Sequence, residues 1–147
     1  MPILGVASGP SSAKGISLER AGVKAYADAA GLGILQPCVL SVAKGFMQDH
    51  IAHRDALIGA VKAAGVKPTE ETTKLDSSSL KTQDDIITFA ESVERQAAST
   101  YLSMILGFKD RQLAQVAGSI LGVETTHVAI LAYTLKKDTE PYKDFVS

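Results

Sequence analysis

Late in the chain, a carboxylate and an imidazole lie three residues apart, Glu124 and His127, within an apolar segment that covers residues 116 to 135. Positions i and i+3 share one face of a helix, and Ile120 and Leu131 belong to the same face. We therefore expect both polar side chains to point into a core. An unpaired buried charge is costly, and a metal ion is one partner that would satisfy both groups.

The elements that must position these groups are predicted to be helices, because period-2 alternation is scarce and alanine is abundant. Thr82 with Asp85 has the spacing of a capping box, and Asp110 can cap a later helix. Glycines and prolines mark the other ends. We expect helices over residues 16–30, 39–64, 82–106 and 111–136. Four helices of this length form a bundle.

The connections between these helices predict their directions. Two are short, so the first and second helices should be antiparallel, as should the third and fourth. The middle connection, residues 65 to 81, can span a helix of about 25 residues, given ~3.3 Å per extended residue and 1.5 Å per helical residue. It can cross the bundle end to end, with an up-down-up-down path as the alternative. We expect an irregular N-terminal arm over residues 1–14 and a single domain over 15–147.

The chain contains an internal repeat. Glu19 and Tyr26 recur as Glu94 and Tyr101 at one offset of 75 residues (94 − 19 and 101 − 26). The pair His50 and His53 aligns with Glu124 and His127 at an offset of 74 (124 − 50 and 127 − 53). Two copies of a helical hairpin, related by a twofold axis, would bring both sets to one point in the core. The candidate metal ligands are Glu19, His50, His53, Glu94, Glu124 and His127.

This pattern resembles the ferritin-like di-iron/di-manganese carboxylate superfamily, in which two helices each give one Glu and two others each give a Glu-x-x-His pair. The matching positions are Glu19, His53, Glu94, Glu124 and His127. The resemblance implies an all-α, ferritin-like four-helix bundle built from two helical hairpins with a long crossover. It also implies two bound metal ions, and it places Tyr26 where many members keep a tyrosine beside them.

One position departs from the family pattern, because His50 stands where the family has the first Glu, usually a bridging ligand. Three glutamates leave a net charge of +1 against two divalent ions. The site could hold an asymmetric pair, a single ion, or an exogenous carboxylate as a substitute bridge. Asp49 lies ~100° round the helix and could replace the bridge only through a helix distortion. Glu91 is either a further acid in the site or a solvent-facing residue.

Composition bounds the remaining function classes. A net charge of −1 with scattered Lys and Arg gives no electrostatic argument for nucleic acid or an anionic membrane. No apolar run approaches the ~20 residues of a membrane span. The single cysteine, Cys38, excludes an internal disulfide and a Cys-based zinc site, and we expect it to be buried. A cytoplasmic protein is expected, with an exported chain whose signal has been removed as the alternative.

The resemblance predicts a di-metal oxidoreductase that reacts with dioxygen or peroxide. Iron is the expected metal, with manganese, zinc or a mixed pair as alternatives. Tyr26 is the candidate catalytic residue, although a packing role with its hydroxyl bonded to a glutamate is the other interpretation. No Cys-x-x-Cys pair is present, so any electron donor would be a separate partner. The alternative functions are metal binding or storage without turnover, and a metal-free helical interaction module. A homodimer is also expected as an assembly.

Overall fold

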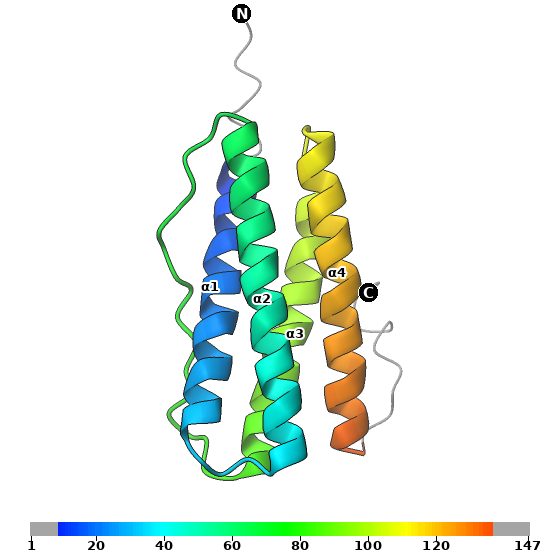
Figure 1. The fold of residues 1–147 in the computed structure, drawn as a ribbon. Coiled ribbons are helices and arrows are strands. Elements are labelled where there is room, and N and C mark those ends of the chain that lie inside the picture. The colour runs from blue at the N-terminus through cyan, green and yellow to red at the C-terminus, as the bar shows by residue number, and fades with distance from the viewer. Residues whose placement is uncertain (1–8, 137–147) are drawn as a thin grey trace, which may run out of the picture.

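The computed structural model describes residues 9–136, which form four helices and no strand (Figure 1). The helices are α1 (Gly9–Gly31), α2 (Pro37–Ala63), α3 (Gln83–Ile105) and α4 (Arg111–Thr134). They lie side by side as a bundle, in which α1 pairs with α2 and α3 pairs with α4. The predicted all-α bundle of two helical hairpins is confirmed.

The first helix begins earlier than predicted. It starts at Gly9 rather than near Ile16, so the prediction of an irregular arm is wrong for residues 9 to 14, and residues 1–8 lie outside the described part. The Gly, Ser and Pro content of this stretch suggested a loop. However, Ser12 and Ile16 are both buried in the bundle, and such tertiary packing outweighs weak helix propensity.

The other helix ends follow the predicted chemistry. The Thr82 side chain accepts from the Asp85 backbone N–H, and the Asp85 carboxylate accepts from the Thr82 N–H, which completes the capping box of α3. The Asp110 carboxylate caps α4 by accepting from the Leu113 N–H at 2.9 Å. Gly65, just beyond α2, has a left-handed φ of 74°, a conformation that glycine adopts without steric cost.

The connection between α2 and α3 runs the length of the bundle along the outer side of α1 (Figure 1). It is attached near its middle, because the Thr73 N–H donates to the Ser17 carbonyl at 3.1 Å and the two side-chain hydroxyls are 2.9 Å apart. Arg20 of α1 forms an ion pair with Glu70 of the connection at 3.0 Å. Helices α2 and α3 are therefore parallel, as the long crossover predicted, and the up-down-up-down alternative is wrong.

Two apolar clusters fill the core, one on each side of a polar layer. The first contains Ile16, Leu57, Tyr101 and Leu113. The second contains Tyr26, Phe46, Ile87 and Leu131. On every helix the candidate ligands fall between the residues of these two clusters. The polar side chains are therefore closed off along the bundle axis in both directions.

Helix α4 is the one helix in the described part that is long and apolar enough to cross a membrane by length and composition alone. The expectation that no apolar run reaches the length of a membrane span is therefore not met by α4. Its polar residues Glu124 and His127 are buried against the other helices, and the core helix of a bundle has the same composition. In this structure α4 is therefore a core helix of the bundle.

Candidate metal centre

The structure brings all six predicted ligands together in the polar layer. One comes from α1, two from α2, one from α3 and two from α4, and each is at most 8% exposed. They form two groups of four in which the potential ligand atoms all lie within 4.8 Å of one another. The groups are Glu19, His50, His53, Glu124 and His50, Glu94, Glu124, His127. His50 and Glu124 belong to both groups, as bridging positions would.

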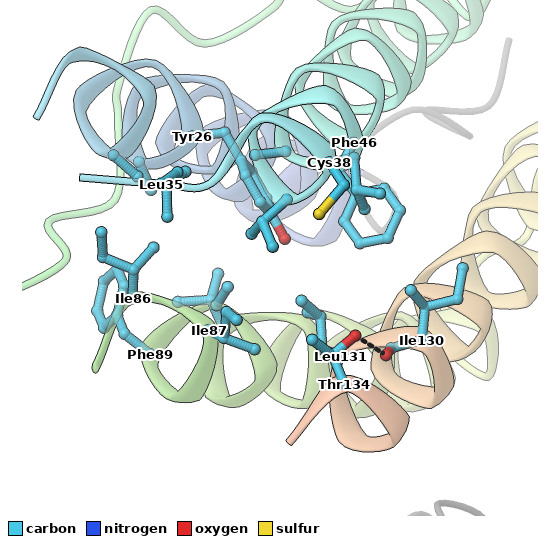
Figure 2. Close-up of a pocket in the computed structure, with 17 residues that line it drawn as sticks. Tyr26, Leu35, Cys38, Phe46, Ile86, Ile87, Phe89, Ile130, Leu131 and Thr134 are labelled. Carbon is cyan, nitrogen blue, oxygen red and sulfur yellow. Dashed lines mark hydrogen bonds between the residues drawn. The ribbon is translucent and has the colours of Figure 1, made fainter. Parts of the chain in front are cut away.

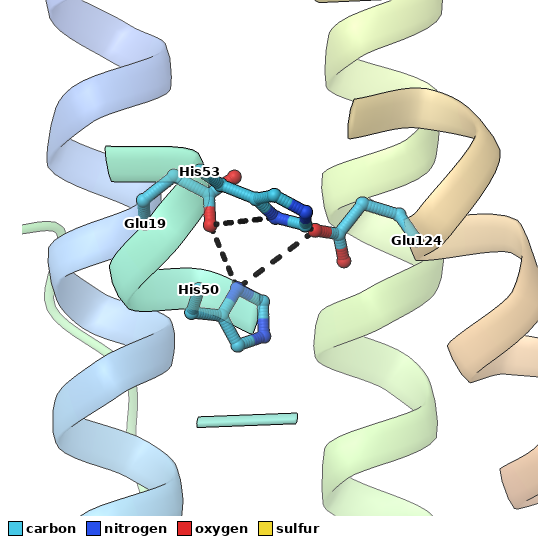
Figure 3. A group of neighbouring side chains, drawn as sticks. All are labelled: Glu19, His50, His53 and Glu124. Carbon is cyan, nitrogen blue, oxygen red and sulfur yellow. Dashed lines mark hydrogen bonds and ion pairs between the residues drawn. The ribbon is translucent and has the colours of Figure 1, made fainter. Parts of the chain in front are cut away.

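The first group joins α1, α2 and α4 (Figure 3). His50 Nδ1 is 2.7 Å from Glu19 Oε2, and His53 Nδ1 is 2.9 Å from Glu124 Oε1. His53 Nδ1 is also 3.5 Å from Glu19 Oε2. Nitrogen and oxygen atoms from three helices therefore converge on one small volume.

The second group adds α3. His50 Nε2 is 3.2 Å from Glu94 Oε1. His127 Nδ1 is 3.4 Å from the same Glu94 oxygen and 3.7 Å from Glu124 Oε2. The imidazole of His50 thus offers Nδ1 to the first group and Nε2 to the second. His50 could therefore contribute to either group, although one imidazole can bind two ions at once only when it is fully deprotonated.

Several buried ligand atoms are close to polar neighbours but have no hydrogen bond to them. These atoms are His53 Nδ1, Glu94 Oε2, His127 Nδ1 and both carboxylate oxygens of Glu124. Buried polar atoms are nearly always hydrogen-bonded, and an exception indicates a missing partner such as an ion. Carboxylate oxygen and imidazole nitrogen are common ligands of divalent transition metals. The residues present therefore fit a pair of such ions.

Two tyrosines fix the glutamates across the hairpins. The Tyr26 hydroxyl of α1 donates to Glu94 Oε1 of α3 at 2.5 Å, and the Tyr101 hydroxyl of α3 donates to Glu19 of α1. The two bonds reproduce the internal repeat as a twofold arrangement. Burial, reinforced by the Glu94 charge, raises the pKa of Tyr26 well above its usual value. Both tyrosines are therefore neutral donors, which supports the packing interpretation of Tyr26.

The three histidines are strongly basic when no metal is bound. Burial alone would lower their pKa values, but the surrounding carboxylates outweigh it. The carboxylates of Glu19 and Glu94 raise the pKa of His50 to about 11. The pKa rises to about 9 for His53 and to about 10 for His127. Metal binding must therefore displace protons from the imidazoles, since a ligating nitrogen has to be free of its proton.

The surroundings of the three glutamates shift their pKa values in different directions. Burial alone would raise the pKa of Glu94, but the nearby Glu124 carboxyl and the imidazoles hold it well below its usual range. The pKa of Glu19 is lowered, because His50 and His53 outweigh its burial. For Glu124, burial and the adjacent Glu94 raise the pKa to about 7. The metal-free site thus has two firmly ionised glutamates and a third that shares a proton near neutrality.

Asp49 has a role that the sequence reasoning missed. Its Oδ2 is 3.0 Å from His127 Nε2, while His127 Nδ1 faces Glu94 and Glu124. Asp49 does not replace a bridging ligand. It bonds the outer nitrogen of the imidazole and leaves the inner one for a metal, which fixes the ring orientation. Its position next to His50 in the sequence was the available signal, whereas its contact with α4 is visible only in the structure.

Gly22 is the second residue that was missed. A Cβ atom built on Gly22 would lie 2.9 Å from both Cγ and Nδ1 of His50, a distance that real Cβ contacts do not show. Glycine inside a helix costs roughly 0.5–1 kcal/mol relative to alanine. A glycine in the middle of a predicted helix was the sequence signal, whereas its position opposite the His50 ring is visible only in the structure. Gly22 makes room for the His50 ring.

Glu91 is buried but belongs to neither ligand group. Its Oε1 accepts from Arg95 Nε one turn later, at 3.0 Å. The solvent-facing alternative for Glu91 is therefore wrong, and the site-acid alternative stays a prediction for a residue that lies outside the two ligand groups. Its pairing with Arg95 of the same helix explains how this carboxylate can be buried.

Two aromatic rings cover the second group. The Tyr26 ring stacks on His50 with a centroid distance of 5.4 Å, and the Phe46 ring stacks on His127 at 3.8 Å. The rings hold the imidazoles in place and exclude water from one side of the centre. A dry, fixed set of carboxylate and imidazole ligands inside four helices defines a helical-bundle protein with a candidate two-metal centre.

Comparison with known proteins identifies the family. A model of the ferritin-like domain matches residues 15–137, so the chain belongs to the ferritin-like family. Two solved structures share the fold. A conserved hypothetical protein from Mycobacterium tuberculosis, Rv2844, superposes with a TM-score of 0.80 at 16% identity, over 90% of this chain and 93% of that one. A ferritin-like, diiron-carboxylate protein from Bacillus anthracis str. Ames has a TM-score of 0.78 at 13% identity, over 92% and 99%. No curated protein matches the chain.

Proposed function

We propose that this protein is an oxidoreductase that binds two divalent metal ions, with iron as the favoured metal, and reacts with dioxygen or peroxide. The observation that carries the proposal is the pair of overlapping buried ligand groups that share His50 and Glu124. Membership of the ferritin-like family supports it. The Bacillus anthracis protein of the same fold is described as a diiron-carboxylate protein.

The ligands divide between the two ions. Glu19 and His53 would hold the first and Glu94 and His127 the second, with the two shared residues, His50 and Glu124, available to either. Bound iron would supply the electrons for reduction of the oxidant. The protein's own part is to orient the glutamates through Tyr26 and Tyr101, to keep water out with the two apolar clusters, and to leave positions open for the oxidant. The electron donor would be a separate partner.

Among the metals that suit the donor set, iron is chosen because the Bacillus anthracis protein of the same fold is described as a diiron-carboxylate protein. The site offers three carboxylates and three imidazoles, and imidazole suits iron, zinc, copper and nickel better than manganese or magnesium. Two divalent ions exceed the three carboxylate charges by one. This excess favours an additional small anion at the centre, which is the role a reduced oxidant could fill.

The test of catalysis is anaerobic loading of the protein with ferrous iron, followed by rapid mixing with dioxygen or hydrogen peroxide. Oxidation of the bound iron should be faster than oxidation of the same concentration of free ferrous iron. The control is Glu124→Gln, which keeps the shape of the residue shared by both groups but removes its charge. Oxidation by wild-type protein at the rate of free iron would exclude the oxidoreductase.

The second candidate is metal binding without turnover, for storage or delivery. The observation that favours it is His50, which replaces the carboxylate that the family uses as a bridge. Substitution His50→Glu distinguishes the two candidates. If the variant gains oxidase activity that the wild type lacks, the natural protein binds metal without turnover. If chelator leaves the melting temperature unchanged, neither holds and the metal-free module remains, since a ligand of the native state must stabilise it.

A further inference from the structure

A cavity of about 210 Å³ lies at the end of the bundle where the α1–α2 turn, the start of α3 and the end of α4 meet (Figure 2). It separates the two helical hairpins at this end. Its walls include Leu35 and Val39 from the first hairpin and Ile87 and Leu131 from the second. Cys38, which was predicted to be buried, is exposed and points its sulfur toward this space.

The lining of the cavity restricts what can bind there. None of its described residues carries a charged side chain. The Tyr26 hydroxyl is already bonded to Glu94, and the Thr134 hydroxyl donates to the Ile130 carbonyl at 2.8 Å. An ionic or strongly polar ligand would lose its hydration without gaining partners. The chemistry therefore selects an uncharged, apolar molecule.

The volume sets the size of that molecule. A dry apolar cavity of roughly 150 Å³ is known to hold benzene. The larger cavity here, about 210 Å³, accommodates a single ring with a short substituent. Ligand pockets of this kind are mostly apolar and concave, and this one opens to solvent beside Val42 and Ile130, whose side chains are 41% and 39% exposed.

The position of the cavity links it to the candidate metal centre. Tyr26 and Phe46 both line the cavity, and the same two rings stack on His50 and His127. A molecule in the cavity would touch one face or edge of each ring, while the imidazoles touch the other. Tyr26 and Phe46 therefore lie between the cavity and two imidazoles of the second ligand group.

We infer that this cavity is a binding site for a neutral, apolar small molecule with one aromatic ring or a group of similar size. Its occupant lies against Tyr26 and Phe46. Binding does not require a metal, so the inference stands or fails independently of the proposed function. The rival occupant is a second copy of this chain that covers Val42 and Ile130, and the experiment distinguishes the two.

The test is titration of metal-free, chelator-treated full-length protein with toluene, followed by calorimetry, with benzoate as the charged probe of similar size. Toluene should bind saturably with one site per chain, and benzoate should not bind. Ala43→Phe, which fills the cavity from α2, should weaken toluene binding by about tenfold or more. Ala56→Phe adds the same ring at an exposed position of α2 outside the cavity and should leave binding unchanged.

Cys38 gives an independent readout. It is the single thiol of the chain and lines the cavity, so toluene should slow its reaction with a thiol reagent and benzoate should not. If Ala43→Phe fails to fold, Ala90→Leu fills the cavity from α3. The inference is overturned if toluene does not bind, if benzoate binds equally well, or if neither filling variant weakens binding. It is also overturned if light scattering shows a dimer that Val42→Asp dissociates and toluene binds to neither form.

Discussion

The substitution Gly22→Ala probes the packing that makes room for His50. In the middle of an exposed helix this change normally stabilises a protein, because alanine has the better helix propensity by about 1 kcal/mol. At Gly22 the added Cβ would lie 2.9 Å from the His50 ring. The ring cannot retreat freely, since Glu19 holds its Nδ1 at 2.7 Å and Glu94 its Nε2 at 3.2 Å.

The two effects oppose each other, and their magnitudes decide the sign. Overpacking of a well-packed interior costs about 1–3 kcal/mol, which exceeds the propensity gain over most of that range. Gly45 of α2 provides the matched control, because a Cβ there would meet nothing within 4 Å. Gly45→Ala should therefore stabilise the protein, and Gly22→Ala should be less stable than Gly45→Ala by about 1–3 kcal/mol.

The assay is thermal unfolding of wild type and both variants, with and without added metal. The difference corresponds to a melting temperature roughly 3–10 °C lower for Gly22→Ala than for Gly45→Ala. Displacement of His50 should also weaken metal binding in Gly22→Ala alone. Equal stabilisation by the two substitutions would refute the reasoning, because it would mean that α1 does not press against the His50 ring.

Three further predictions follow from the site. Tyr101→Phe removes the hydroxyl that donates to Glu19. Denaturant unfolding should show that this variant is less stable than the wild type by about 1.5–3 kcal/mol. The control Tyr133→Phe, at a 77% exposed position, should have no effect. Asp49→Asn removes the charge of the side chain that pairs with His127 Nε2. The variant should keep its fold but bind metal about 10- to 100-fold more weakly, as measured by competition with a chelator. When a chelator keeps the site free of metal, the melting temperature should fall as the pH rises from about 6.5 to 9. In the folded protein the pKa is about 11 for His50, about 9 for His53 and about 10 for His127, whereas in the unfolded chain it is about 6.5. The stabilisation by the charged histidines is therefore complete below pH 6.5 and is lost as the pH rises. A chelated protein whose stability rises over this range would exclude imidazolium–carboxylate pairing in the metal-free site.

The fold was predictable because local and long-range signals agreed. The capping box at Thr82, the cap at Asp110 and the glycine at 65 fixed three helix ends by backbone chemistry. The length of the middle connection then decided the topology. The start of α1 was not predictable, because Gly9–Lys14 carry weak local signals and become helical through packing of Ser12 and Ile16 in the bundle.

The clustering of the six candidate ligands was predictable, because the repeat adds a matched sequence offset to a motif that is weak on its own. A lone Glu-x-x-His occurs by chance, whereas two hairpins with matched offsets must meet if they are related by a twofold axis. Asp49, Gly22 and the pairing of Glu91 with Arg95 were not predictable in the same way. Each depends on the distance and rotation between neighbouring helices, which a helical period alone does not contain.

We expect the two buried ligand groups to bind two metal ions per chain. The most direct measurement is elemental analysis by mass spectrometry of protein purified without a metal-affinity column, before and after anaerobic reconstitution with ferrous iron. The expected stoichiometry is near two ions per chain for the wild type, and Glu124→Gln should lose this binding. Absence of bound metal after reconstitution, or equal binding by Glu124→Gln, would contradict it.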